Sequence, residues 1–297
     1  MSPAGADSLA VASRPSPLAL AQTTLVTTAL GLGEEAVLTV DSESGPADKE
    51  RFVRGVEQAL LAGRADLGVH SAKDLPGEMT TGLVVAAVPE RADARDAWIG
   101  PGCSVEEIPE GARVGTSSPR RRAQLMAVRP DLVMVEMAGN VDTRLEKLGA
   151  GDVDGLVLAM AGLERLGRAA EAAFAFDPEA MVPAAGQGAL VVQGRVNGTG
   201  LERAAAISDE FSFACLEAER AAVVAVGAGC DSPVGFHATC SDTRMAIDGF
   251  AGRIDGSAWL RDRVEGDLSR PAQLGRELAG RMLAAGAAGI LADTVGM

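Results

Sequence analysis

The sequence contains few aromatic residues and few histidines. Only 3% of its 297 residues are Phe, Trp or Tyr, and Tyr is absent. Proteins that bind bases or sugars by stacking need aromatic side chains, so neither type is expected. The two histidines, His70 and His237, are too few for a His-rich metal site, and no metal is predicted.

The cysteines are also few and show no motif spacing. Cys103, Cys215, Cys230 and Cys240 include no Cys-x-x-Cys pair, which argues against a zinc ribbon, a thioredoxin motif and a disulfide scaffold. The first cation is Arg14, and no apolar run approaches the roughly 18 residues of a membrane span. We therefore expect a cytoplasmic protein with no membrane association.

Positive charge is scarce over the whole chain. The 27 basic and 41 acidic residues give a net charge of −14, which argues against binding along a nucleic-acid backbone. One segment differs, because residues 111–130 hold five arginines and no acid. A solvated basic helix face would explain this pattern, but so would a polyanionic small ligand, because Arg forms forked contacts with carboxylates and phosphates.

Short β-branched runs alternate with helical patterns from residue 8 to about 195. This alternation predicts α/β domains with mainly parallel sheets. The expected strands are residues 8–13, 36–40, 66–70, 83–89, 112–117, 133–137 and 155–160, and the expected helices are 17–31, 49–63, 119–128 and 141–151. Seven strands predict two such domains.

Two further segments have a sequence pattern that differs from this alternation of strands and helices. A stretch rich in Gly and Pro begins near Asp96 and is interpreted as a hinge or linker. After residue 208 the pattern indicates a long helix over 211–226, strands over 245–253 and 258–267, and a final helix over 271–287. These elements predict a small α+β domain.

Hydroxyl and charged side chains follow three of the expected strands. Arg14 and Ser16 follow the first, the segment 71–74 follows the third, and residues 116–122 follow the fifth. The carboxyl ends of parallel strands commonly bind ligands, and helix N-termini that begin with Ser-Pro favour anions. We therefore expect a site for a carboxylated or phosphorylated small molecule.

Two residues near these motifs have competing interpretations. Asp74 is either a helix cap or ion-pair partner of Lys73, or a carboxylate that moves protons and faces a developing cation. Cys230, framed by Gly227 and Gly229, is either a small buried hydrophobe or a thiol exposed for covalent attachment. Cys215 lies on the apolar stripe of its predicted helix and is assigned to the core.

Seven sequence strings occur in an order that matches a known family. They are SRPSPLALAQ, ADLGVHSAKDLP, VGTSSPRRRAQL, GNVDTRLEKL, LAMAGLERLG, PAAGQGAL and GCDSPVG. Together they resemble the hydroxymethylbilane synthases, also called porphobilinogen deaminases. The resemblance implies two type II periplasmic-binding-protein-like α/β domains with the active cleft between them, residues 1–94 with 189–207 and residues 95–188, followed by a small α+β domain over 208–297.

The resemblance also implies an activity and a cofactor. Members of this family deaminate four porphobilinogen molecules and join them head to tail on a dipyrromethane primer. The resemblance places that primer on Cys230 through a thioether and the catalytic carboxylate at Asp74. The implied carboxylate assists loss of ammonia, holds the cationic azafulvene and takes up the pyrrole proton. The linear product, hydroxymethylbilane, is released by hydrolysis, and the implied enzyme is a monomer of heme and tetrapyrrole biosynthesis.

Further site residues are implied position by position. The cofactor-binding set is Ser71, Lys73, Thr116, Ser117, Ser118, Arg120, Arg121 and Arg144. The substrate-binding set is Arg14, Ser16, Arg144, Arg165 and Gln187, and the end of a mobile loop is represented by Lys49, Phe52 and Arg54.

The sequence departs from the family pattern at two places in particular. Ala138 stands where an Arg is usual, and the loop over 41–48 is short and acidic. Two alternatives to an active synthase follow. One is a diverged paralogue with low or no turnover, and the other is a non-catalytic receptor for a polycarboxylate.

Overall fold

The computed structural model describes residues 9–41, 51–229 and 231–292, apart from the side chains of Arg51 and Phe52. The chain forms two compact units, Met1–Arg91 with Ala189–Phe213 and Ala92–Gly188 with Ala214–Met297. No helix in these described ranges is long and apolar enough to cross a membrane. The predicted division into three domains stays a prediction.

The first unit contains a five-stranded sheet in the order β2-β1-β3-β10-β4. Its strands are β1 (Val11–Ser13), β2 (Val37–Thr39), β3 (Leu67–Ser71), β4 (Leu83–Ala87) and β10 (Leu190–Arg195), and its helices include α1 (Pro17–Ala29), α2 (Arg51–Leu61) and α6 (Leu201–Ala205). Strands β1, β2 and β3 are parallel, and β10 runs antiparallel to both β3 and β4. Strands β3 and β10 are more than a hundred residues apart in the sequence, and their pairing joins the two segments of this unit.

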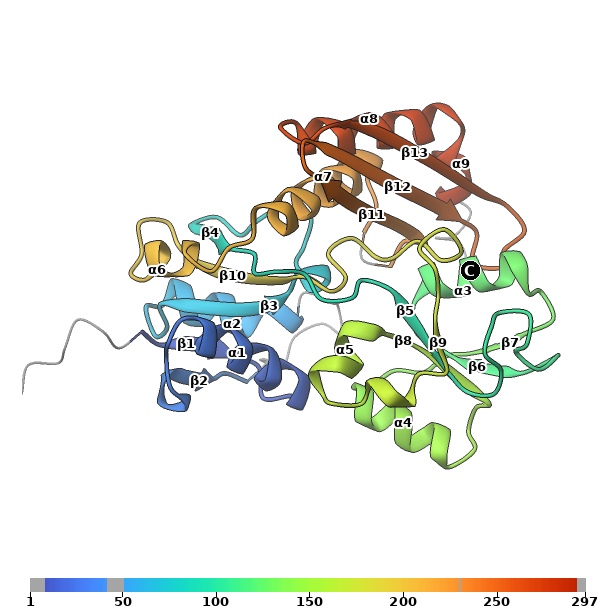
Figure 1. The fold of residues 1–297 in the computed structure, drawn as a ribbon, viewed down its shortest axis with the longest axis horizontal. Coiled ribbons are helices and arrows are strands. Elements are labelled where there is room, and N and C mark those ends of the chain that lie inside the picture. Colours follow the sequence, from blue (N-terminus) through green and yellow to red (C-terminus); the bar gives the residue numbers. More distant parts are fainter. Residues whose placement is uncertain (1–8, 42–50, 230, 293–297) are drawn as a thin grey trace, which may run out of the picture. The chain divides into compact units, whose positions relative to one another are not determined.

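The second unit contains a sheet of the same design in the order β7-β6-β8-β5-β9 (Figure 1). Its elements are β5 (Asp96–Ile99), β6 (Arg113–Gly115), α3 (Pro119–Val128), β7 (Val133–Val135), α4 (Val141–Gly149), β8 (Gly155–Ala159), α5 (Met160–Arg165) and β9 (Phe174–Ala175). Here β6, β7 and β8 are parallel, and β5 is the antiparallel strand. The two sheets thus share one topology.

Helices α1 and α3 begin where local capping predicts. Ser16 accepts a hydrogen bond from the Ala19 N–H at the start of α1, and Ser118 accepts one from the Arg121 N–H at the start of α3. Each Ser is followed by Pro at the first helical position, where a missing N–H costs nothing. These caps place Arg14 and residues 116–118 directly at the carboxyl ends of strands β1 and β6.

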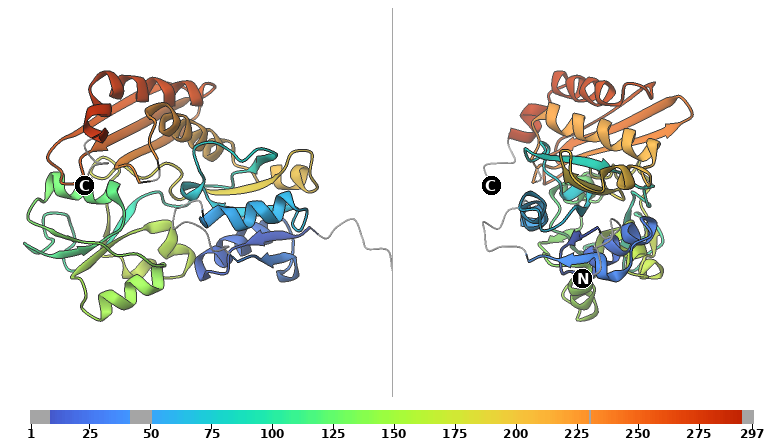
Figure 2. Two further views of the ribbon diagram at one scale, coloured as in Figure 1. Left: turned by 180° about the vertical axis from the view of Figure 1, so that it is seen from behind. Right: turned by 90° about the vertical axis from the view of Figure 1, so that its left-hand side faces the viewer.

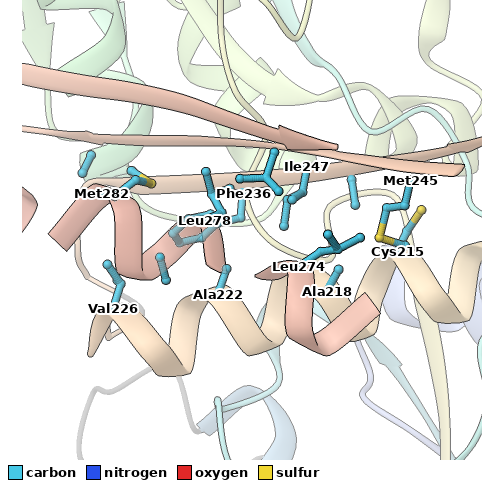
Figure 3. Packing of buried hydrophobic residues seen from close by; sticks show 14 of the residues in the cluster. Cys215, Ala218, Ala222, Val226, Phe236, Met245, Ile247, Leu274, Leu278 and Met282 are labelled. Carbon is cyan, nitrogen blue, oxygen red and sulfur yellow. The ribbon is translucent and has the colours of Figure 1, made fainter. Parts of the chain in front are cut away.

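The second unit also includes an antiparallel three-stranded sheet. Its strands are β11 (Val234–Ser241), β12 (Arg244–Gly252) and β13 (Trp259–Asp267). Helices α7 (Glu210–Val226), α8 (Pro271–Ala284) and α9 (Ala287–Ala292) accompany it, and α8 contacts β12 and β13 (Figure 2). Phe236, Ile247 and Leu278 form the centre of their shared core (Figure 3). Cys215 is 6% exposed in this cluster, so its assignment to the core is confirmed.

The predicted fold class is confirmed by these three sheets, with two corrections. The segment near Asp96, interpreted as a hinge or linker, is the buried strand β5. Strands β9, β10 and β11 were also missed, and the two large sheets are mixed because of the antiparallel strands β5 and β10.

Candidate functional site

The first unit has a small pocket at the carboxyl ends of two neighbouring strands. Because β1 and β3 are adjacent and parallel, the residues that follow them meet at one edge of the sheet. Arg14, Ser71 and Asp74 line this pocket, together with Ala19, Gln22, Val53, Val69 and His70. The structure therefore brings together the two charged residues that the sequence analysis singled out on separate strands.

Asp74 and Arg14 face each other in this pocket. The Oδ2 atom of Asp74 lies 3.9 Å from Nη1 of Arg14, and the two side chains are 27% and 25% exposed. Asp74 ends the short 3₁₀ helix Ala72–Asp74 that follows β3. The sequence analysis did not foresee this contact with Arg14, and its alternative of an ion pair between Asp74 and Lys73 stays a prediction. A carboxylate and a guanidinium that are both accessible can contact a ligand of mixed charge.

A buried polar chain supports one wall of the pocket. Gln193 donates its Nε2 hydrogen to Glu57 at 2.9 Å and presents its Oε1 to Nε2 of His70, also at 2.9 Å. Thr80 donates to the second Glu57 oxygen at 2.8 Å. Burial lowers the pKa of His70 to about 4, against the opposing effects of Glu57 and Gln193. His70 is therefore neutral at pH 7, and its ring is fixed by β10.

In the second unit, Arg144 lies beside the hydroxyl groups that follow β6. Its Nη2 donates to Ser117 Oγ at 3.4 Å, and its Nε donates to the carbonyl of Gly139 at 2.9 Å. Burial and the positive charge of Arg121 lower the pKa of Arg144 to about 10, while Glu136 opposes the shift. A nearby anion would stabilise this guanidinium.

Arg165 has a similar environment at the end of α5. Its Nη2 donates to the carbonyl of Gly188 at 2.6 Å, but its buried Nε has no hydrogen-bond partner among the described residues. Burial lowers the pKa of Arg165 to about 10. A buried donor without an acceptor is costly, so a ligand oxygen would be a favourable partner.

Arg120 and Arg121 are held by a buried carboxylate, Asp96 in β5. Asp96 is fully buried and accepts from Arg120 Nη1 at 2.7 Å, from Arg121 Nε at 2.8 Å and from Gln187 Nε2 at 3.0 Å. Burial alone would raise the pKa of Asp96, but the two arginines outweigh it and the pKa is lowered. The carbonyls of Val157 and Val182 complete the network.

This network changes the interpretation of the arginine-rich segment over 111–130. Arg113 pairs with Asp154 at 2.8 Å and Arg129 pairs with Asp131 at 2.7 Å, in addition to the Asp96 pairs. The acids come from outside the segment, so its local excess of positive charge is largely compensated within the unit. Of the three arginines in α3, only Arg122 is exposed, so a solvated basic helix face does not account for Arg120 and Arg121.

The remaining predicted site residues are only partly described by the structure. Lys49 and Cys230 lie outside the described residues, as does the loop over 42–50, and the side chain of Phe52 is not described. Arg54 is half-buried in α2, Thr116 is buried, and Ser16 and Ser118 serve as the helix caps given above.

The chain matches two family models over nearly its whole length. Residues 9–203 match the porphobilinogen deaminase, dipyromethane cofactor binding domain, and residues 213–284 match the porphobilinogen deaminase C-terminal domain. The chain belongs to the porphobilinogen deaminase family. The predicted resemblance is confirmed.

Curated porphobilinogen deaminases of bacteria are similar to the chain along most of their length. The protein of Roseiflexus castenholzii is 41% identical over 96% of this chain and 99% of its own. The protein of Rubrobacter xylanophilus is 43% identical over 95% of this chain and 96% of its own, and that of Deinococcus radiodurans is 43% identical over 82% and 80%. These relatives support the enzyme and neither of the two alternatives.

Solved structures with distant similarity include two periplasmic proteins. A TRAP periplasmic solute binding protein from Pseudomonas putida F1, with bound D-glucuronate, aligns with a TM-score of 0.40 at 10% identity over 68% of this chain and 77% of that one. The Bordetella pertussis BvgS periplasmic VFT2 domain aligns with a TM-score of 0.38 at 16% identity, over 67% and 86%.

The residues of the second unit fit the cofactor of the porphobilinogen deaminase family. Dipyrromethane carries carboxylate side chains, and the unit provides two partly buried guanidinium groups, Arg144 and Arg165, whose charge is incompletely compensated. The unpartnered Nε of Arg165 and the hydroxyl of Ser117 are suitable donors for carboxylate oxygens. An anionic cofactor therefore suits this donor set.

The sequence analysis identified residues that line the candidate site, but it missed buried residues that position them. Asp96 was interpreted as the edge of a linker, although the apolar residues Ala97, Trp98 and Ile99 that follow it indicate a buried strand. The hydrogen-bonded network of Glu57, Gln193 and His70 joins three separate elements, and no local sequence pattern indicates it.

Proposed function

We propose that this chain is an active hydroxymethylbilane synthase. In this function it joins four porphobilinogen molecules head to tail on a dipyrromethane held by Cys230 through a thioether, and it releases the linear product by hydrolysis. The chain works as a monomer in the cytoplasm. The observation that carries the proposal is the Asp74 carboxylate beside Arg14 in a pocket at the ends of β1 and β3, in a chain of the porphobilinogen deaminase family.

Asp74 performs the proton chemistry in this proposal. Each cycle breaks the bond between the substrate's aminomethyl carbon and its nitrogen, and the nitrogen leaves as ammonia. The carboxylate of Asp74 stabilises the positive charge that develops on the substrate's pyrrole at that moment. After the new carbon–carbon bond forms, the same carboxylate accepts the proton lost from the pyrrole carbon.

Arg14 binds and orients the substrate. Porphobilinogen carries an acetate and a propionate, and a guanidinium forms forked hydrogen bonds with such carboxylates. Because Arg14 lies 3.9 Å from Asp74, a substrate carboxylate on Arg14 is held close to the acid that acts on the same molecule. The neutral His70, fixed by Gln193, adds no competing charge to the pocket wall.

The remaining predicted residues divide into binding and positioning groups. When bound, the dipyrromethane supplies the pyrrole carbon to which the first porphobilinogen is joined. We propose that Ser71, Lys73, Thr116, Ser117, Ser118 and Arg144 bind its carboxylates and that Ser16, Arg144 and Arg165 bind those of the substrate. Arg120, Arg121 and Gln187 act through Asp96. The loop assignment is kept as a proposal for Lys49 alone, because Phe52 and Arg54 lie in helix α2, which corrects the sequence-based expectation for these two residues.

The test is turnover of porphobilinogen by the purified protein. Ammonia release and formation of a linear tetrapyrrole should proceed together, with four ammonia molecules for each hydroxymethylbilane. Reversible binding of porphobilinogen without ammonia would instead show the non-catalytic receptor. Ammonia release at a rate indistinguishable from a buffer control would likewise overturn the proposal.

A further inference from the structure

The C-terminal core places two thiols in direct contact. The Sγ of Cys215, in α7, lies 3.1 Å from the Sγ of Cys240, in β11. Cys215 is buried, whereas Cys240 is partly exposed. Figure 3 shows Cys215 at one end of the buried cluster beside Met245, the residue that pairs with Cys240 across the sheet.

A second contact holds the same helix face against the same strand face. Glu219 is fully buried in α7, and its Oε1 accepts a hydrogen bond from the Ala238 N–H of β11 at 2.7 Å. Glu219 follows Cys215 by one helical turn, and Ala238 precedes Cys240 by two strand residues, so the two contacts lie side by side. The approach of the two sulfur atoms is thus fixed by secondary structure.

We propose that Cys215 and Cys240 form a reversible disulfide when the protein meets a peroxide. The more accessible Cys240 thiolate attacks one peroxide oxygen and becomes a sulfenic acid, with release of water. The thiol of Cys215 then attacks that sulfur, the S–O bond breaks, and a second water leaves. The two thiols together lose two electrons and two protons, and one hydrogen peroxide becomes two waters. A dithiol reductant reverses the change by exchange.

The crosslink would join the two elements that flank the segment over 227–233. Cys215 and Cys240 are separated by 25 positions, so the disulfide closes a loop that contains the end of α7, this segment and most of β11. Closing such a loop restricts the unfolded chain, so the oxidised protein should unfold at a higher temperature. The inference does not depend on the role proposed for Cys230.

The experiment is peptide mapping of the full-length protein after treatment with hydrogen peroxide. Trypsin cleaves after Arg203, Arg220 and Arg244, which leaves Cys215 in one peptide and both Cys230 and Cys240 in the next. We expect a crosslinked pair that is lighter than its two peptides by two hydrogen atoms and that separates on reduction. Fragment ions between residues 230 and 240 assign the bond to Cys240.

Matched variants make the result decisive. Cys240→Ser should abolish the crosslinked pair and the rise in unfolding temperature, whereas Cys103→Ser, at an exposed position, should retain both. The proposal is overturned if peroxide modifies the exposed Cys103 but produces no Cys215–Cys240 bond. It is also overturned if Cys240 accumulates as sulfinic acid while Cys215 stays a thiol.

Discussion

At Asp74, one carboxylate in a pocket with Arg14 carries the proposed chemistry. Replacing Asp74 with Asn keeps the shape but removes the negative charge and the proton acceptor, so we expect kcat to fall about 100-fold or more. The unfolding midpoint should stay close to that of the native protein, because Asp74 is partly exposed.

Glu78 provides a matched control for that change. It is an exposed acid four residues along the same segment, and Glu78→Gln should leave the rate of ammonia release unchanged. Equal rates for the native protein and Asp74→Asn would remove Asp74 from the mechanism.

Asp96 has a structural rather than a chemical importance. In Asp96→Asn the buried guanidinium groups of Arg120 and Arg121 lose their counter-charge, which we expect to cost about 3–5 kcal/mol of unfolding free energy. Asp154→Asn removes an exposed pair with Arg113 and should cost much less, because solvent screens the charges of that pair. Urea unfolding measures both, and similar losses would refute the central role of Asp96.

His70 gives the stability a pH dependence of known sign. Because burial lowers its pKa from 6.5 to about 4, the unfolded chain binds a proton in this interval that the folded chain does not. The contribution of neutral His70 to the unfolding free energy is therefore fully present above pH 6.5. It falls by about 3 kcal/mol as the pH is lowered towards 4. In His70→Gln the unfolding free energy should fall less over this interval; an unchanged slope would contradict the account.

Residue identities were predicted best where the chemistry is local. Ser16 and Ser118 cap helices as expected, because a cap depends on neighbours within three residues. The partners of Arg120 and Arg121 were not predictable in this way, since Asp96 lies more than twenty positions away and its ion pairs form only when β5 packs. Cys230 falls outside the described residues, and its role stays a prediction.

Among the elements, helix α8 contains two glycines in opposite environments. A Cβ on Gly275 would overlap the carbonyl oxygen of Ala218 in α7, whereas a Cβ on Gly280 would meet nothing within 4 Å. Alanine normally stabilises a helix relative to glycine by up to about 1 kcal/mol. We therefore expect Gly280→Ala to raise the unfolding free energy by about that amount.

Gly275→Ala should have the opposite effect. Forcing α7 and α8 apart offsets the gain in helix propensity, and we expect a net loss of about 1–3 kcal/mol. Thermal unfolding of the two variants tests this difference, and a stabilised Gly275→Ala would show that the two helices do not pack as described.

The elements that sequence patterns missed are those with distant partners. Helix α3 was predicted with its correct bounds, because its cap and its period are contained in ten residues. Strand β10 pairs with β3 across more than a hundred positions, and its burial on both faces removes the alternation that marks a strand. Strand β5 was obscured by Gly100, Pro101 and Gly102, which follow it directly.

For the whole molecule, the net charge describes the average of the sequence and not the local charge at a site. The value of −14 argues against nucleic acid, but it says nothing about single guanidinium groups such as Arg14, Arg144 and Arg165. Arg144 and Arg165 are set apart by burial that lowers their pKa, and Arg14 by its place beside Asp74, which only the folded chain shows.

The central claim is that this chain carries a covalent dipyrromethane on Cys230 and uses it as the primer. The intact mass of the protein, purified from cells supplied with porphobilinogen, tests it most directly. The mass should exceed that of the sequence by one dipyrromethane, and Cys230→Ala should lose this increment while Cys103→Ala keeps it. A native protein with the bare sequence mass, or an increment that survives in Cys230→Ala, would contradict the claim.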